Sequence, residues 1–139
     1  MPNVVELLKQ DHREVEALFS QFESTTDPEI AEKICEELDL HTKVEEEAVY
    51  APLRSEVQGG AGMAEHAEEE HAKARQIIGR IRQTTDPEHL GEVVRELKSA
   101  VEEHVDEEEA EVFPKMENEM GATRLDEIGT EVEGLKAAS

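Results

Sequence analysis

Two segments of the chain place a histidine four residues before a glutamate. His41 and Glu45 stand in "HTKVEEE", and His104 and Glu108 stand in "HVDEEEAE". Residues four apart on a helix lie about one turn apart on the same face, so each pair can direct an imidazole and a carboxylate at one centre. This ligand set suits iron, manganese or zinc, and the lack of thiolate ligands argues against a structural zinc site. The spacing predicts metal binding.

The chain repeats itself around these two motifs. An acid–histidine pair begins each half, at His12 and at His71, and both halves reach "TTDPE" at the same distance after that histidine. A His-x-x-x-Glu motif follows in each half, and an aromatic residue comes after it, Tyr50 in the first half and Phe113 in the second. Chance recurrence of a common helix start is the alternative. The matched distances favour a duplicated helix–turn–helix unit.

The helices that must position these residues can be read from capping and periodicity. Asp27 and Asp86 suit N-caps, because a proline follows each at the first helical position. The long helices are expected at about 3–23, 28–50, 63–83 and 87–118, with a shorter one at about 123–136. We expect one all-α domain over residues 1–139: an antiparallel four-helix bundle with a short fifth C-terminal helix. Its two helical hairpins span about 3–50 and 63–118, joined at the flexible segment "QGGAG" (58–62).

The apolar stripes of these helices contain ligand-type residues. Steps of three and four residues place six of them facing inward: His12, His41, Glu45, His71, His104 and Glu108. A buried carboxylate without a partner is costly, and no Lys or Arg lies on these stripes. A single core histidine is more often a packing residue, and an acidic run is more often a solvated helix face. Six inward residues together favour a metal, and the duplication predicts two centres.

Composition excludes several classes of function. The formal net charge is −22, with 36 acidic and 14 basic residues, which argues against binding nucleic acid or an anionic membrane. A lone cysteine, Cys35, fits a reducing compartment. No secretory signal and no membrane-spanning stretch are present in the sequence. We therefore expect a cytoplasmic protein.

The ordered pattern resembles the haemerythrin-like family, also called the HHE cation-binding domain. The resemblance covers residues 1 to about 118, including "DH" on the first helix and "EE" plus a proline after each motif. It implies two iron ions with an oxo or hydroxo bridge, which react with dioxygen, nitric oxide or peroxide. Carried across, the terminal ligands are His12, His41, His71 and His104, and the bridging carboxylates are Glu45 and Glu108.

The pattern departs from the oxygen-carrying haemerythrins in one place. Those proteins have a His-x-x-x-His pair on the third helix, whereas Ala67 stands four residues before His71 here. His66 stands five residues before it and should face away from the centre, unless a local π-bulge rotates it inward. The second iron then lacks one protein ligand, and water, Glu68 or a substrate would complete its coordination. Ferritin-like di-iron proteins need Glu-x-x-His twice, and only Glu68 with His71 fits that spacing.

A site with fewer imidazoles has more open positions, which favours redox chemistry. We expect a protein that reduces or detoxifies peroxide or nitric oxide, or senses them, with an unidentified electron donor or protein partner. A reversible oxygen or iron carrier is the alternative, and an acidic interaction bundle is a third interpretation. Tyr50 either turns inward as a proton donor or ligand or, as we favour, lies at the boundary with its hydroxyl in water.

Overall fold

The structure is a computed structural model that describes residues 2–139. The chain is helical throughout: α1 (Val4–Thr25), α2 (Pro28–Val44), η1 (Glu45–Val49), α3 (Tyr50–Glu56), α4 (Gly60–Gln83), α5 (Pro87–Glu107), η2 (Glu108–Val112) and α6 (Phe113–Ala137). No strand occurs within these described residues. The expected all-α helical bundle is confirmed. No helix in residues 2–139 combines the length and apolarity that a bilayer span requires.

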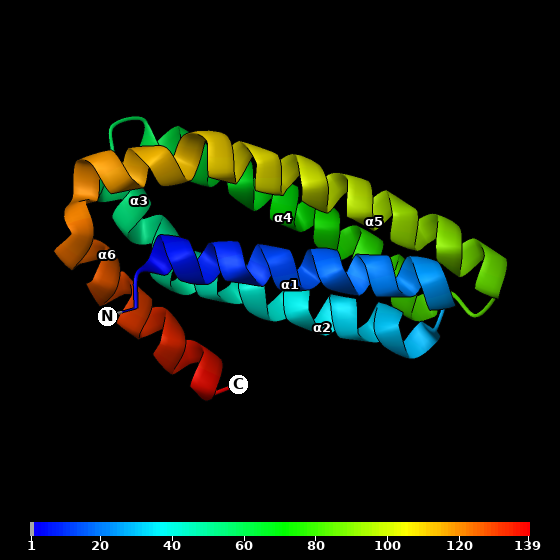
Figure 1. Cartoon of the computed structure of the whole chain (residues 1–139). Helices are drawn as coiled ribbons and strands as arrows, with labels where there is room; N and C mark the ends of the chain where they lie inside the picture. Colours follow the sequence, from blue (N-terminus) through cyan, green and yellow to red (C-terminus); the bar gives the residue numbers. More distant parts are fainter. Residues whose placement is uncertain (1) are drawn as a thin grey trace.

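The two "TTDPE" segments begin helices as the sequence predicts. Asp27 caps α2 by accepting a hydrogen bond from the Glu29 backbone N–H at 2.9 Å. Asp86 caps α5 in the same way, accepting from the His89 backbone N–H at 2.9 Å. Both turns lie at the same end of the bundle, and α1 runs beside α2 as α4 runs beside α5 (Figure 1). The four long helices therefore enclose one interior.

Each His-x-x-x-Glu motif runs into a short π-helix that the sequence did not indicate. The segment predicted as one helix over 28–50 instead comprises α2, then η1 from Glu45, then α3 as far as Glu56. The segment predicted over 87–118 comprises α5, then η2 from Glu108, then the start of α6. A π-turn inserts one residue into a helix, so it changes which later side chains face the interior. Both π-helices begin at a candidate metal ligand.

The end of the chain and the joint between the halves also differ from expectation. The predicted separate helix at 123–136 is the second part of α6, which bends at Gly121, where φ is 82° and ψ is 162°. The joint is shorter than 58–62, because α4 already begins at Gly60. Among the glycines of that segment only Gly59 has a positive φ, 77°. After the bend, α6 packs along α1. The assignment of residues 1–139 to a single domain stays a prediction.

Two apolar clusters fill the bundle and leave a polar layer between them. One cluster lies toward α3 and α6 and includes Leu8 and Val44. The other lies toward the "TTDPE" turns and includes Val15 and Leu38. On α1, His12 lies between Leu8 of the first cluster and Val15 of the second. On α2, His41 lies between Leu38 of the second cluster and Val44 of the first. The polar side chains are therefore held between two dry layers, which keep water from the interior.

Candidate metal centre

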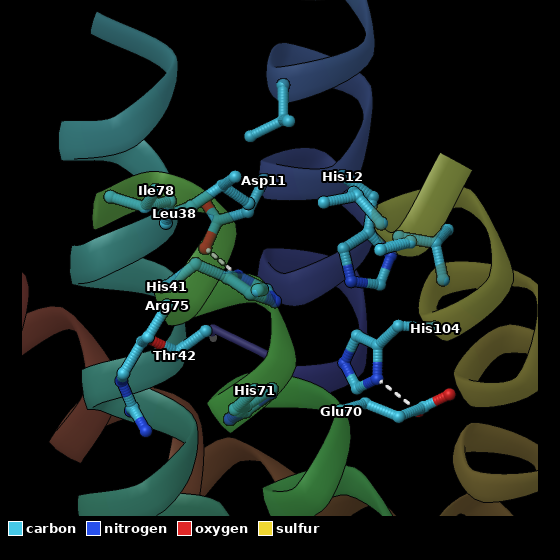
Figure 2. A pocket seen from close by; sticks show the side chains of 15 residues that line it. Asp11, His12, Leu38, His41, Thr42, Glu70, His71, Arg75, Ile78 and His104 are labelled. Carbon is cyan, nitrogen blue, oxygen red and sulfur yellow. Dashed lines mark hydrogen bonds and ion pairs between the residues drawn. The ribbon is translucent and has the colours of Figure 1, made fainter. Parts of the chain in front are cut away.

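Four helices each contribute one histidine to the polar layer. His12 comes from α1, His41 from α2, His71 from α4 and His104 from α5, and their rings turn toward a common space (Figure 2). His12 and His41 form one pair, with ring centroids 5.0 Å apart, and His71 and His104 form a second, 4.9 Å apart. The first three are buried, and the side chain of His104 is 12% exposed. The structure thus brings together all four predicted histidines.

The two predicted bridging glutamates each lie between the histidine pairs. Glu45 Oε1 is 3.1 Å from His41 Nε2 and 3.2 Å from His71 Nε2. Glu108 Oε1 is 2.9 Å from His12 Nε2, and its Oε2 is 3.5 Å from His104 Nε2. Both glutamates are buried. Each carboxylate therefore reaches one imidazole of each pair, which is the placement that a bridging ligand needs.

Carboxylates on other helices hold all four imidazoles by the opposite ring nitrogen. His12 Nδ1 is 2.6 Å from Glu109, His41 Nδ1 is 3.0 Å from Asp11, His71 Nδ1 is 2.7 Å from Glu46 and His104 Nδ1 is 2.8 Å from Glu70. When an imidazole is neutral, as metal ligation requires, Nδ1–H donates to the carboxylate and Nε2 carries its lone pair toward the interior. Such carboxylate–histidine pairs fix ring orientation and raise ligand basicity at metal sites.

Lys and Arg side chains hold three of these four outer carboxylates in turn. Arg13 binds Glu109 and Arg75 binds Glu46, while Lys136 at the end of α6 binds Asp11. We did not predict these outer carboxylates and their basic partners from the sequence. The one available signal was that the candidate ligands are preceded by an acid in "DH" and "EH" and followed by one in "EE".

The electrostatics show that Glu45 needs positive charge beside it. Burial alone would raise the pKa of Glu45, but the nearby charge of His41 together with the contacts to Glu108 and His104 holds it well below its ordinary value. Burial lowers the pKa of His41, whereas Glu45 and the bond to Asp11 raise it to about 10. Burial likewise lowers the pKa of His104, and the nearby carboxylates of Glu108, Glu45 and Glu70 together produce a net increase. In the metal-free protein, protons on His41 and His104 offset the buried carboxylates.

The donor atoms that face the interior have no hydrogen-bond partners, despite their short separations. These buried atoms are His12 Nε2, His41 Nε2, His104 Nε2, both oxygens of Glu45 and Oε1 of Glu108. Buried polar atoms are rarely left unpaired in native proteins, so such a cluster calls for a ligand. Their atoms form two groups, His12–His41–Glu108 and Glu45–His71–His104, with ligand atoms within 4.8 Å of one another in each. The residues fit two cations.

Comparison with known families agrees with this geometry. The chain matches the family described as the Hemerythrin HHE cation binding domain over residues 3–116, and a second match covers residues 69–137. The chain belongs to this family. The family and the side-chain clusters support a metal-binding protein. That these six residues are the ligands, and that the metal is iron, stay predictions.

One curated relative of this haemerythrin-family chain is a protein of Nostoc sp. (strain PCC 7120 / SAG 25.82 / UTEX 2576) named DNA nickase. The two are 26% identical over 141 residues, which cover 97% of this chain and 39% of the relative. The chain thus spans less than half the length of that protein. No solved structure matches the chain.

Tyr50 does not lie at the boundary with its hydroxyl in water, as we favoured from the sequence. The residue is 1% exposed, and its hydroxyl is 3.1 Å from His71 Nε2. Burial first, and then the charge of Glu45, raise the pKa of the phenol, so it stays protonated at neutral pH. The π-helix η1 ends just before Tyr50. The inward interpretation of Tyr50 is therefore the right one.

The other residues that the family pattern left open do not face the histidines. The side chain of His66 is 59% exposed and lies 2.9 Å from Glu107, so no π-bulge turns it inward. Glu68 is half-buried and pairs with Arg54 at the surface. Ala67 is buried and lines a cavity of about 250 Å³ that reaches His104. The place of a fifth imidazole is therefore open space.

Proposed function

We propose that the chain is a cytoplasmic non-haem di-iron protein that reacts with small oxidants, namely peroxide, nitric oxide or dioxygen, in redox detoxification or sensing. The observation that carries the proposal is the set of unpartnered donor atoms in the polar layer, with each imidazole held from behind by a carboxylate. In this assignment His12 and His41 would hold one iron, His71 and His104 would hold the other, and Glu45 and Glu108 would be shared between them.

Bound iron supplies Lewis acidity and electrons, and the chain supplies position and shelter. An antiparallel bundle, with the second part of α6 as its short fifth helix, would hold the four imidazoles on rigid elements. The outer carboxylates keep each Nε2 aimed inward, which pre-organises the ligands for the metal. The apolar clusters on both sides exclude water. The cavity beside Ala67 gives a small molecule a route to the His71–His104 side.

Tyr50 is the group best placed to deliver a proton at that side. Reduction of peroxide to water consumes two electrons and two protons, so a donor of electrons and a source of protons are both required. The electrons come from an external reductant that the sequence does not identify. The protonated hydroxyl of Tyr50 lies against the His71 ring in a buried position, and it can donate without opening the site to solvent. Tyr50→Phe should therefore slow turnover while leaving the metal bound.

A reversible oxygen or iron carrier is the alternative. A substitution at Ala67 tests which of the two functions the chain has. The experiment compares the iron-loaded wild type with Ala67→His, in which an imidazole enters the cavity one turn before His71. Steady-state consumption of hydrogen peroxide with a chemical reductant is expected for the wild type and should fall in the variant. His89→Ala, on the exposed surface, is the matched control. A wild type that consumes no peroxide but forms a stable, reversible oxygen spectrum would show the carrier instead.

We do not propose the DNA nickase function named for the Nostoc relative for this chain. Binding a phosphate backbone requires Lys and Arg, whereas this chain has 36 acidic against 14 basic residues. The chain also covers 39% of that relative, so most of the relative has no counterpart here. We propose no contact with nucleic acid or with membranes for this chain.

A further inference from the structure

A second group of metal-ligating side chains lies at the surface, outside the buried centre. His66, Glu70 and Glu107 each offer a ligand atom, and these atoms lie within 4.8 Å of one another. His66 Nε2 is 2.9 Å from Glu107 Oε2 and 3.5 Å from Glu70 Oε2. His66 is exposed and Glu107 is half-buried, with side-chain exposures of 59% and 38%. We refer to these three residues as the outer cluster.

The outer cluster stands at the mouth of the cavity that leads to the buried centre. The same cavity of about 250 Å³ is lined by His66, Glu70 and Glu107 and, further in, by His104 and Glu108. Glu108 is 2% exposed, and its Oε1 has no hydrogen-bond partner. The cavity therefore joins a set of ligand atoms at the surface to a buried carboxylate with one unpaired oxygen.

Glu70 links the two groups directly. Its Oε1 is 2.8 Å from His104 Nδ1, and its Oε2 is 3.5 Å from His66 Nε2. Figure 2 shows Glu70 reaching the ring of His104 from α4. One carboxylate thus touches a residue of the buried centre and a residue of the outer cluster.

The charge of the cavity suits a cation. Four glutamates line it, the fourth being Glu111, and no Lys or Arg is among its lining residues. Arg75, by contrast, lines the smaller cavity of about 30 Å³ on the other side of the histidines. Clefts lined by charge of one sign concentrate ions of the opposite sign and speed their capture. The wider cavity therefore favours the approach of a divalent cation.

We propose that the outer cluster is a transit site, which captures a divalent cation at the surface and passes it through this cavity to the buried centre. Imidazole and carboxylate ligands suit first-row divalent cations. Two carboxylates and one imidazole on an exposed surface bind such a cation weakly enough to release it inward. The inference rests on the proposed metal centre, but it concerns the rate of loading and not the final content.

The test measures how fast metal-free protein takes up Co²⁺, followed by the visible absorption that appears when Co²⁺ enters the buried ligands. The variant is His66→Ala/Glu107→Gln, which removes the outer cluster but none of the proposed ligands. The control is His89→Ala/Glu92→Gln, an exposed pair on α5 with side-chain exposures of 56% and 60%. Both double variants lose one imidazole and one negative charge.

We expect the first variant to load about tenfold more slowly, which is the lower end of the effect of focused charge, and to reach the same final cobalt content. The control should load at the wild-type rate. Equal rates in all three proteins would overturn the transit site while leaving the metal centre intact. A lower final content in the first variant would also overturn it, because His66 or Glu107 would then be a permanent ligand. A wild type that takes up no cobalt would contradict the metal centre itself, and the transit site with it.

Discussion

Two histidines on one helix should respond very differently to the same substitution. His71 and His66 both lie on α4, one buried and one on the surface. His71 is 2% exposed and contacts three groups: Glu46 at 2.7 Å, Tyr50 at 3.1 Å and Glu45 at 3.2 Å. His66 is 59% exposed and contacts only glutamates at the surface. We compare His71→Ala with His66→Ala.

The size of the difference follows from these contacts. His71→Ala leaves the Tyr50 hydroxyl without its hydrogen-bond partner and removes one partner from Glu46, which Arg75 still binds. An orphaned buried polar group costs roughly 1–3 kcal/mol, so the total loss in metal-free protein is about 2–4 kcal/mol. At about 4 °C per kcal/mol for a chain of this size, the Tm should fall by roughly 8–16 °C. Loss of the exposed His66 pair costs less than about 1 kcal/mol.

The assay combines thermal unfolding of the metal-free proteins by circular dichroism with metal analysis of the iron-loaded ones. His71→Ala should lose about half of its metal or its charge-transfer bands, whereas His66→Ala should keep both. Equal loss of metal and of charge-transfer bands in the two variants would contradict the assignment of His71 alone as a ligand. It would make His66 a fifth imidazole, and the open position beside Ala67 would no longer support redox chemistry.

Three further predictions concern pH, packing and the outer carboxylates. In metal-free protein the pKa of His41 is raised to about 10, so its stabilisation is complete below about pH 6.5 and is lost as pH rises toward 10. The Tm should fall over that window and change less in metal-loaded protein in the same buffers; parallel curves would argue against a cation beside His41. A Cβ on Gly129 would lie 1.9 Å from the Pro2 carbonyl oxygen, whereas one on Gly134 in the same helix meets nothing within 4 Å. Gly129→Ala should therefore lower the Tm, and Gly134→Ala should leave it unchanged or raise it, by up to ~1 kcal/mol of helix propensity; similar Tm values would show that α6 does not pack as described. Asp11→Asn should weaken metal binding by about 10- to 100-fold in a chelator competition, because His41 loses its charged partner; unchanged affinity would remove Asp11 from the site.

Local pattern was sufficient to predict the helices and the inward residues. The apolar steps on α1 predicted that Leu8, His12 and Val15 share a face, and all three are buried. The caps at Asp27 and Asp86 were predictable because proline is favoured at the first helical position, where its missing N–H costs no hydrogen bond. The repeat then paired His71 with His12, and it placed His66 outside the core. These inferences depend only on neighbours along one helix.

Interactions between helices could not be predicted in the same way. Among 36 acidic residues, nothing local marks Glu46 or Glu109 as the carboxylate that binds an imidazole on another helix. A π-turn has no compositional signature, so η1 and η2 read as ordinary helix. Without η1, the side chain of Tyr50 falls near the edge of the helix face, which explains why we favoured a boundary position for it.

We propose that this haemerythrin-family chain holds two iron ions in its buried layer. The most direct measurement is the iron content of protein expressed with iron and purified, taken together with its near-ultraviolet absorption. We expect close to two irons per chain and oxo-to-iron charge-transfer bands. One iron per chain, or none, would contradict the paired assignment of His12 with His41 and of His71 with His104.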